Sequence, residues 1–335
     1  MPTIRDIAQR AQVSPATVSR VLNNYPNVHE ATRATVLRAA HDLNYTNDSP
    51  RSSQRATETV LVLTRDTNMP NGKAAAVGRE FERTVWGGVS AYFQEKQIPA
   101  RLQSTGISGA AAQQYAQDPG VSGLVLLGGV INRDFVARLQ SLMVPVVIAG
   151  AHLRPMQVNC VMADVFDGMS QVLVHLLEGA GRQRIGFVNG VPTTTTSQMK
   201  LDAFHLELCR HDLPFSPDRV AVSDFEAAAG YATTSQLLER HPDLDAIVFA
   251  DDVIAIGGLK ALRETGRRVP DDVAVTGFGD YDLAQFVEPN LTTVHYDMHA
   301  IGRIAARRLS MLMTEPDADT WFNLVPPKLV RRQSA

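Results

Sequence analysis

Residues 13–23 read VSPATVSRVLN, and they follow a short run, TIRDIAQRA, at residues 3–11. In the first run apolar residues recur at helical spacing and predict one buried face: Ile4, Ile7, Ala8 and Ala11. In the second run Ser14 is placed to cap a helix, and Pro15 would take the first helical position, where no backbone N–H is needed. The stretch therefore predicts a helix, a tight turn and a second helix.

The second helix has two dissimilar faces. Val18, Val21 and Leu22 are expected to point inward, which leaves small, hydroxylated and basic side chains outside: Pro15, Ala16, Thr17, Ser19, Arg20 and Asn23. Such side chains at the start of an exposed helix suit insertion into the major groove of DNA. An ordinary helical hairpin on a protein surface has the same spacing, so the pattern alone leaves both interpretations open.

The residue string itself resembles the DNA-binding headpiece of the LacI/GalR family of bacterial transcription regulators. The resemblance continues through residues that would form a third helix: Val28, Thr32, Arg33, Val36, Ala39, Ala40, Leu43 and Tyr45. It implies one set of residues facing base edges or the adjoining backbone: Pro15, Ala16, Thr17 and Arg20. It implies a second set that would contact phosphates, which position a protein without specifying sequence: Ser14, Ser19, Asn23 and Tyr45.

The length and the charge distribution of the chain indicate a small basic domain followed by a larger acidic part. A chain of 335 residues predicts two or three domains. The net charge of −3 divides into about +3 for residues 1–55 and −6 for the remainder, and the basic part would meet phosphates. Such a modest excess would need to be doubled in a dimer for tight DNA binding.

The same sequence predicts a cytoplasmic protein without a membrane span. It has no run of 18 apolar residues, and its N-terminus lacks the basic and apolar segments of a signal peptide. We expect Cys160 and Cys209 to be reduced core residues rather than a disulfide or a metal site. No cofactor is expected, and the Ser-x-x-Lys spacing of Ser197 and Lys200 lacks the companion motifs of an acyl-enzyme.

Residues 46–59 contain almost nothing apolar and predict a linker. Beyond them short apolar runs alternate with helical patterns. The runs are at 60–63, 124–127, 146–149, 185–188, 220–222, 246–249 and 273–275, and the clearest helical patterns are at 80–97, 166–179, 227–240 and 253–265. This alternation predicts parallel sheets with helices on both faces, and the length predicts two lobes.

The core also resembles that of the LacI/GalR family, above all at residues 245–257, 269–278 and 289–294. The resemblance implies an α/β fold: an N-terminal helix-turn-helix headpiece, then a two-lobed core of doubly wound parallel sheets, like a type I periplasmic binding protein. The expected domains are a headpiece at 1–46, a hinge linker at 47–59 and an effector-binding core at 60–335. Within the core, the N-lobe would hold about 60–162 plus 292–320, and the C-lobe about 163–291 plus 321–335.

Ligands of open α/β sheets bind beyond the carboxyl ends of the strands. Polar and aromatic residues just past apolar runs are therefore candidates for effector binding: Arg65, Asp66, Lys200, Phe225, Asp251 and Asp280. Carboxylates and an aromatic ring suit a polyhydroxylated ligand. Each has an ordinary alternative. Asp252 is favoured as a helix cap, Asp251 fits ligand contact or a structural role equally, Phe225 fits the core, and Asp280 fits a turn.

The core departs from the family pattern at two places near this site. Lys200 stands where the family usually has Arg, and it loses the bidentate fork that grips vicinal hydroxyls. Gly279 replaces the first Asp of a Gly-Phe-Asp-Asp motif, and residues 67–79 look like an insertion. A carbohydrate or a derivative remains the expected effector.

The linker departs too. In the family a hinge Leu enters the minor groove and kinks the DNA, whereas the matching positions here are Asn47, Asp48, Arg51, Ser52 and Gln54. The hypothesis is that this protein bends its operator less or depends more on the major groove.

The sequence thus predicts a DNA-binding transcription regulator, a repressor rather than an enzyme. It would act as a homodimer, or as a tetramer, on a roughly palindromic operator. A ligand between the lobes would bias their closure and couple two distinct sites, either releasing DNA or promoting its binding. The alternative is a solute-binding protein without a regulatory role, which the headpiece and the missing signal peptide oppose.

Overall fold

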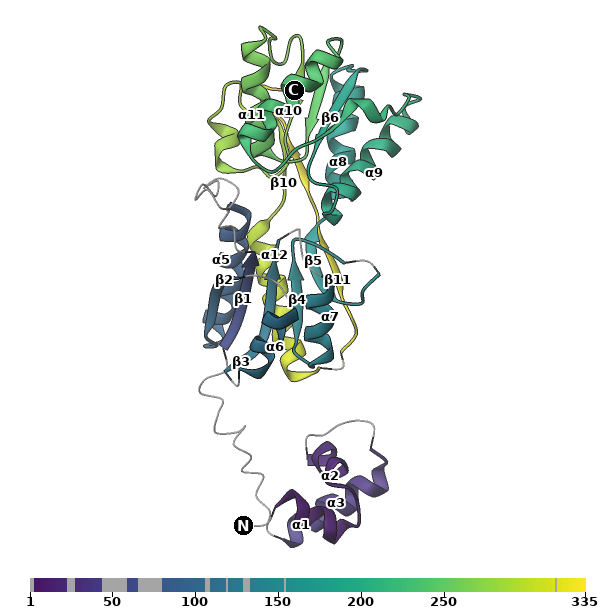
Figure 1. Ribbon diagram of the computed structural model, residues 1–335, viewed down its shortest axis with the longest axis vertical. Coiled ribbons are helices and arrows are strands. Elements are labelled where there is room, and N and C mark those ends of the chain that lie inside the picture. The colour runs from purple at the N-terminus through teal and green to yellow at the C-terminus, as the bar shows by residue number, and fades with distance from the viewer. Residues whose placement is uncertain are drawn as a thin grey trace. The chain divides into compact units, whose positions relative to one another are not determined.

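The computed structural model describes residues 3–22, 28–43, 59–65, 80–105, 109–118, 120–128, 133–153, 155–316 and 318–335. Contacts divide the chain into two units, Met1–Thr57 and Glu58–Ala335 (Figure 1). The hinge positions lie outside the described residues. So do Asn23, Tyr45, Asp66 and the stretch 67–79.

The N-terminal unit is a three-helix module of α1 (Ile4–Ala11), α2 (Pro15–Leu22) and α3 (Glu30–Asp42). Thr3 and Asp6 form a capping box that fixes the start of α1, because each side chain bonds the other residue's backbone N–H. Small and branched residues from all three helices form the core: Ile7, Ala8, Ala11, Val18, Val21, Val36, Ala39 and Ala40. The predicted apolar face is confirmed for Ile7, Ala8, Ala11, Val18 and Val21.

The first lobe contains a parallel sheet whose strands run in the order β11-β5-β4-β3-β1-β2. Its strands are β1 (Thr59–Arg65), β2 (Ala100–Thr105), β3 (Val121–Leu127), β4 (Val146–Ala149), β5 (Asn159–Ala163) and β11 (Phe322–Val325). The helices are α5 (Glu80–Glu95), α6 (Gly109–Gln117), α7 (Arg133–Ser141) and α12 (Met298–Thr314). Val60 and Val62 face the cluster that contains α5 and α12, whereas Leu61 and Leu63 face that of α6 and α7. Burial on both faces explains the unbroken apolar runs.

The second lobe contains a smaller parallel sheet in the order β7-β6-β8-β9. Its strands are β6 (Ile185–Asn189), β7 (Val220–Val222), β8 (Ala246–Phe249) and β9 (Ala274–Thr276). Its α-helices are α8 (Val165–Val174), α9 (Thr195–Arg210), α10 (Ala227–Arg240) and α11 (Asp252–Glu264). A π-helix, η3 (His175–Gly179), continues α8, and two short 3-10 helices are η4 (Pro217–Arg219) and η5 (Asp282–Gln285). Side chains of α8 and α9 pack on one face of the sheet, and those of α10 and α11 pack on the other (Figure 1).

The chain passes between the lobes after β5, after β10 (Thr293–His295) and between β11 and β12 (Lys328–Val330). The strands β10 and β12 pair antiparallel beside α8, where Gln171 accepts a hydrogen bond from the backbone N–H of Leu329 at 2.9 Å. Near the chain end, wholly buried Ser334 donates its hydroxyl to the carbonyl of Val275 in β9 at 2.6 Å.

These crossings correct the expected lobe boundaries near 292 and 321. The strand β11 pairs with β5, so Phe322–Val325 belong to the first-lobe sheet rather than to the second. Conversely, Thr292 bridges Thr276 at the end of β9 and therefore lies with the second lobe. The chain returns to the edge of the first sheet before it ends in the second lobe, and the expected boundaries omitted that return. Cys160 is buried as predicted, but Cys209 is exposed, so its expected core position is wrong.

Candidate nucleic-acid interface and effector site

The start of α2 has the predicted cap. The backbone N–H of Thr17 donates to the Ser14 hydroxyl oxygen at 3.1 Å, and the two hydroxyls lie 2.8 Å apart. Pro15 is the first helical residue. The cap satisfies a backbone donor that would otherwise lack a partner, so the exposed end of this short helix has a defined geometry.

On the outward face of α2, Pro15 and Arg20 are exposed and Thr17 is half-buried. Thr17 and Arg20 are three residues apart, so they lie on one side of the helix, away from buried Val18 and Val21. Ala16 and Ser19 belong to α2, but their side chains lie outside the described part of the structure. α2 has no acidic residue in its first turn, and Arg20 adds a positive charge to its last. The surface therefore suits a polyanion.

In the second lobe, Asp251 is the N-cap of α11. Its Oδ1 accepts from the backbone N–H of Val253 at 2.8 Å, and its Oδ2 accepts from the hydroxyl of Tyr281 at 3.1 Å. Burial raises the pKa of this carboxyl, against the hydrogen bond from Val253 and the nearby charge of Lys200. The sequence pattern favoured Asp252 as the cap of this helix, but the N-cap is Asp251, one residue earlier.

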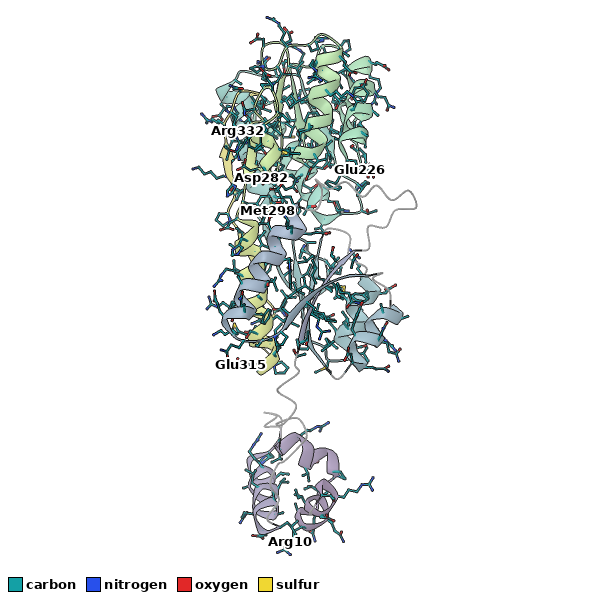
Figure 2. The ribbon with its side chains drawn as sticks, turned by 90° about the vertical axis from the view of Figure 1, so that its left-hand side faces the viewer. Arg10, Glu226, Asp282, Met298, Glu315 and Arg332 are labelled. Atoms are coloured by element: carbon teal, nitrogen blue, oxygen red, sulfur yellow. The ribbon has the colours of Figure 1, made fainter. Side chains whose placement is uncertain are left out.

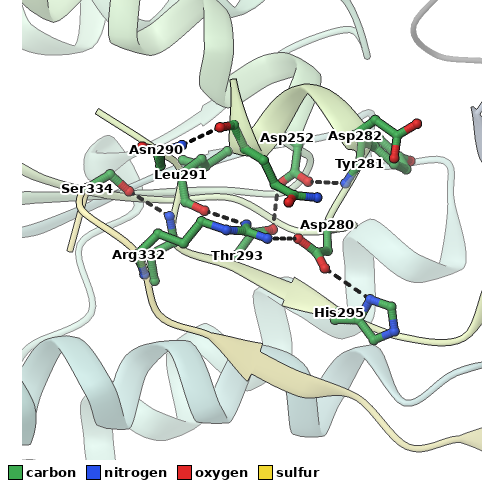
Figure 3. Close-up of polar contacts among 12 residues, drawn as sticks. Asp252, Asp280, Tyr281, Asp282, Asn290, Leu291, Thr293, His295, Arg332 and Ser334 are labelled. Carbon is green, nitrogen blue, oxygen red and sulfur yellow. Dashed lines mark hydrogen bonds and ion pairs between the residues drawn. The ribbon is translucent and has the colours of Figure 1, made fainter. Parts of the chain in front are cut away.

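Asp252 instead joins three segments of the second lobe. It is wholly buried and accepts from the backbone N–H of Tyr281 at 2.9 Å and from the hydroxyl of Thr293 in β10 at 2.5 Å (Figure 3). Desolvation raises the pKa of Asp252 to about 7. This carboxyl ties the start of α11 to the loop after β9 and to a crossover strand.

Lys200 lies in the second turn of α9, and only 7% of it is exposed. Its ammonium donates to the carbonyl of Ala250 at 2.6 Å and lies 3.8 Å from the centre of the Phe278 ring. Burial lowers the pKa of Lys200 to about 8, against the attraction of Asp251 and Asp252. The cation therefore stabilises the loop that follows β8.

Asp280 is a turn residue with positive φ, 54°, and its carboxylate lies beside an arginine and a histidine. One oxygen lies 2.5 Å from the Nη2 of Arg332, and the other lies 3.1 Å from the Nδ1 of His295 (Figure 3). Arg332 also donates to the carbonyl of Leu291 at 2.8 Å. Neither Arg332 nor His295 was a sequence candidate, because both are far from Asp280 along the chain.

The remaining candidates do not join this cluster in the described structure. Phe225 is half-buried and packs over Gly190, where an added Cβ would lie 2.3 Å from the ring. Arg65 ends β1, but its side chain, like the whole of Asp66, lies outside the described residues. The structure thus brings Lys200, Asp251 and Asp252 together. It adds Tyr281 and Thr293, which the sequence reasoning missed.

Two cavities lie away from these residues. The larger, of about 600 Å³, lies along α10 and α11: Ala227, Ala228, Tyr231, Ile256, Gly257, Leu259, Lys260, Arg263, Val287 and Glu288 line it. The smaller, of about 260 Å³, lies where the start of β6 meets the end of α9. Neither is lined by any of the six effector candidates. The described residues contain no group of His, Cys, Asp or Glu that could hold a metal ion, and no described helix could span a membrane.

Comparisons with known proteins cover both units. The sequence profile of bacterial regulatory proteins of the lacI family matches residues 3–48, and that of the periplasmic binding protein-like domain matches residues 174–335. The chain is 32% identical to the transcriptional regulator CelR of Thermobifida fusca, over 94% of each chain. It is also 32% identical to the transcriptional regulator MalR of Streptomyces coelicolor, over 99% of this chain and 96% of that one. A solved complex of CelR with cellobiose superposes with a TM-score of 0.76 at 29% identity over the full length of both chains.

Proposed function

The chain belongs to the LacI family of bacterial DNA-binding transcription regulators, and from this we propose that it is a repressor controlled by a carbohydrate bound between its lobes. Members of this family are regulators and not enzymes. The observation that carries the proposal is the capped, outward-facing start of α2 on a packed three-helix module, attached to a core of two parallel-sheet lobes.

In this proposal α2 enters the major groove of the operator. Pro15, Ala16, Thr17 and Arg20 read base edges or the adjoining backbone, and Ser14, Ser19, Asn23 and Tyr45 hold phosphates. Because Thr17 already bonds Ser14, its methyl group is the part free for a thymine contact. The hinge positions, Gln54 among them, would wedge the minor groove less than a leucine does.

A carbohydrate effector is supported by the relatives and by the chemistry of the candidates. CelR has been solved with cellobiose, and the ribose operon repressor of Haemophilus influenzae is 27% identical over 100% of this chain and 98% of that one. Asp251, Asp280 and Phe225 would contact the sugar from the second lobe, and Arg65 and Asp66 from the first. Lys200 would support the site indirectly, by positioning the loop after β8, because its ammonium already donates to the Ala250 carbonyl.

A homodimer is supported by the groove along α10 and α11. Apolar residues form part of the lining of the groove, and Phe286, 81% exposed, directly precedes its lining residue Val287. Leu283, 40% exposed, projects from the same η5 segment. A groove beside a protruding aromatic is self-complementary under a two-fold axis, so a second copy of the chain is the occupant we propose.

The proposal is tested with the full chain and a labelled duplex from the DNA upstream of its own gene. Fluorescence anisotropy should show a saturable, salt-dependent complex, and a scrambled duplex should bind far more weakly. Cellobiose, maltose and ribose are then added singly, and a thermal shift identifies the sugar that binds the fold. No complex with or without any sugar would favour a solute-binding protein instead.

The substitution Asp251→Asn tests the effector site independently of the DNA-binding surface. Asparagine caps a helix about as well as aspartate, so α11 should stay intact while a charged acceptor for sugar hydroxyls is lost. We expect DNA binding without effector to stay within about twofold of wild type and the response to the sugar to disappear. A response that survives removes Asp251 from the effector site. The exposed neighbour variant Asp224→Asn controls for the loss of negative charge.

A further inference from the structure

Among the residues that the structure describes, hydrogen bonds join the two lobes at two points away from the chain crossings. At the first, the backbone N–H of Asp282 in the second lobe donates to both carboxylate oxygens of Glu80, at 3.2 and 3.3 Å. Glu80 is the first residue of α5 in the first lobe. Asp282 lies at the waist where the lobes meet (Figure 2). A carboxylate here supplies a partner for the first backbone donor of η5, which a helix cannot satisfy internally.

At the second point, the hydroxyl of Thr195 donates to the carbonyl of His152 at 2.5 Å. Thr195 begins α9 in the second lobe, and His152 lies in the first-lobe loop after β4. Both contacts use one side chain and one backbone group from opposite lobes. Each therefore fixes a distance between lobes and would break if the lobes separated.

The Glu80 contact is also tied to the buried cluster of the second lobe. Tyr281 directly precedes Asp282 and makes two hydrogen bonds. Its backbone N–H donates to Asp252 (Figure 3). Its hydroxyl donates to Asp251. The position of the Asp282 N–H thus depends on the residues that hold Tyr281. Burial of Glu80 and the neighbouring carboxylates of Asp282 and Asp280 raise its pKa, so this acceptor gains from a well-placed donor.

We propose that Glu80 and Thr195 are positioning residues that latch the lobes together, and that Tyr281 links this latch to Asp251. A ligand hydroxyl that bonded Asp251 would compete with the Tyr281 hydroxyl and thereby displace the donor that Glu80 accepts. The link to a ligand rests on the proposed function. The latch is a property of the core alone, and it is tested without any effector.

The test measures the distance between the lobes by electron–electron resonance of two spin labels. Exposed Cys209 labels the second lobe, Met143→Cys labels the first at a residue that is 72% exposed, and buried Cys160 is protected. Labelled chains are mixed with excess unlabelled protein, so that only distances within one chain are read. Glu80→Ala should raise the ratio of separated to joined lobes about tenfold, as expected for losing a hydrogen bond to a charged group.

Matched variants distinguish a latch from general damage. Glu80→Gln keeps an acceptor and should restore most of the joined population, and Thr195→Ser should do the same for Thr195→Val. Glu82→Gln alters another carboxylate in the same turn of α5. The described structure shows no bond from Glu82 to the second lobe, so this variant should leave the distance distribution unchanged. Unchanged distance distributions in both Glu80→Ala and Thr195→Val would overturn the latch. If Tyr281→Phe leaves the distribution unchanged while Glu80→Ala shifts it, the latch stands and the link through Tyr281 is rejected.

Discussion

The roles of Asp251, Asp252 and Lys200 in the structure differ from those that their positions in the sequence indicate. Asp251 and Asp252 are adjacent, yet one caps a helix and the other is wholly buried between β10 and the loop after β9. Lys200 stabilises a backbone carbonyl. The sequence could identify this polar group, because it follows β8, but it could not assign the roles. Those roles depend on Tyr281 in the loop after β9 and on Thr293 in the crossover strand β10.

At the DNA surface, Arg20 is the residue whose loss should be most specific. Arg20→Ala should weaken binding to the operator by about 1–3 kcal/mol if the guanidinium contacts a guanine edge. Binding to an unrelated duplex should weaken less, because only one phosphate-attracting charge is lost. Competition anisotropy with both duplexes measures the difference. Equal losses on the two would assign Arg20 to the backbone.

Buried Lys200 should give the second lobe a recognisable pH dependence. Its pKa is about 8 in the folded protein against an ordinary 10.5, so between these values the unfolded chain holds a proton that the folded chain has released. Stability therefore gains from this residue as pH rises from 8 toward 10. Urea unfolding of wild type and Lys200→Met across that range should show the gain in wild type alone. Lys260→Met, at an exposed lysine, should behave as wild type.

At the scale of elements, the sequence predicts best what is buried on both sides. Strands β3 and β8 are unbroken apolar runs between chain turns, and the structure confirms them. Strand β2 was missed because it is a sheet edge with polar, exposed residues. Strand β11 was missed because it is a short edge strand with two of its four residues exposed. Edge strands are held by backbone pairing, which leaves little trace in side-chain pattern.

Helices α5 and α12 approach so closely that a glycine is required. A Cβ on Gly88 would lie 2.1 Å from the carbonyl oxygen of His299, whereas a Cβ on Gly87 would meet His299 only at 3.8 Å. Gly88→Ala should therefore cost about 1–3 kcal/mol of unfolding free energy through backbone displacement. Gly87→Ala should be neutral or stabilising by up to about 1 kcal/mol, since alanine favours a helix. Denaturant midpoints of the two variants check this contrast.

For the whole molecule, the fold class follows from the order of its elements, but the partition into lobes does not. Alternation of strand and helix predicts parallel sheets wherever it occurs. Which sheet a strand joins is decided by long-range pairing, as β11 shows by joining β5 across nearly half of the chain. The contacts of Glu80 with the other lobe could not be predicted from the sequence either, because Glu80 and Asp282 are 202 residues apart along the chain.

Assembly of two copies should depend on Phe286. Phe286→Glu places a charge where an apolar anchor is expected, and loss of such an anchor typically costs 2 kcal/mol or more, about thirtyfold in the dimer dissociation constant. Sedimentation velocity at graded concentrations measures this directly. Met143→Glu, at another exposed apolar residue, should leave the dimer unchanged. A dimer insensitive to Phe286→Glu would locate the interface elsewhere.

The last fourteen residues finish both lobes, which has a consequence for biosynthesis. Strand β11 supplies one edge of the first sheet, and Ser334, next to the final residue, bonds Val275 inside the second. While the ribosome still holds these residues, neither sheet has its full complement of partners, although the headpiece has long emerged. A nascent or truncated chain thus presents a folded DNA-binding module on an unfinished core. Regulation by an effector therefore requires that residues 322–335 have left the ribosome and joined the two sheets.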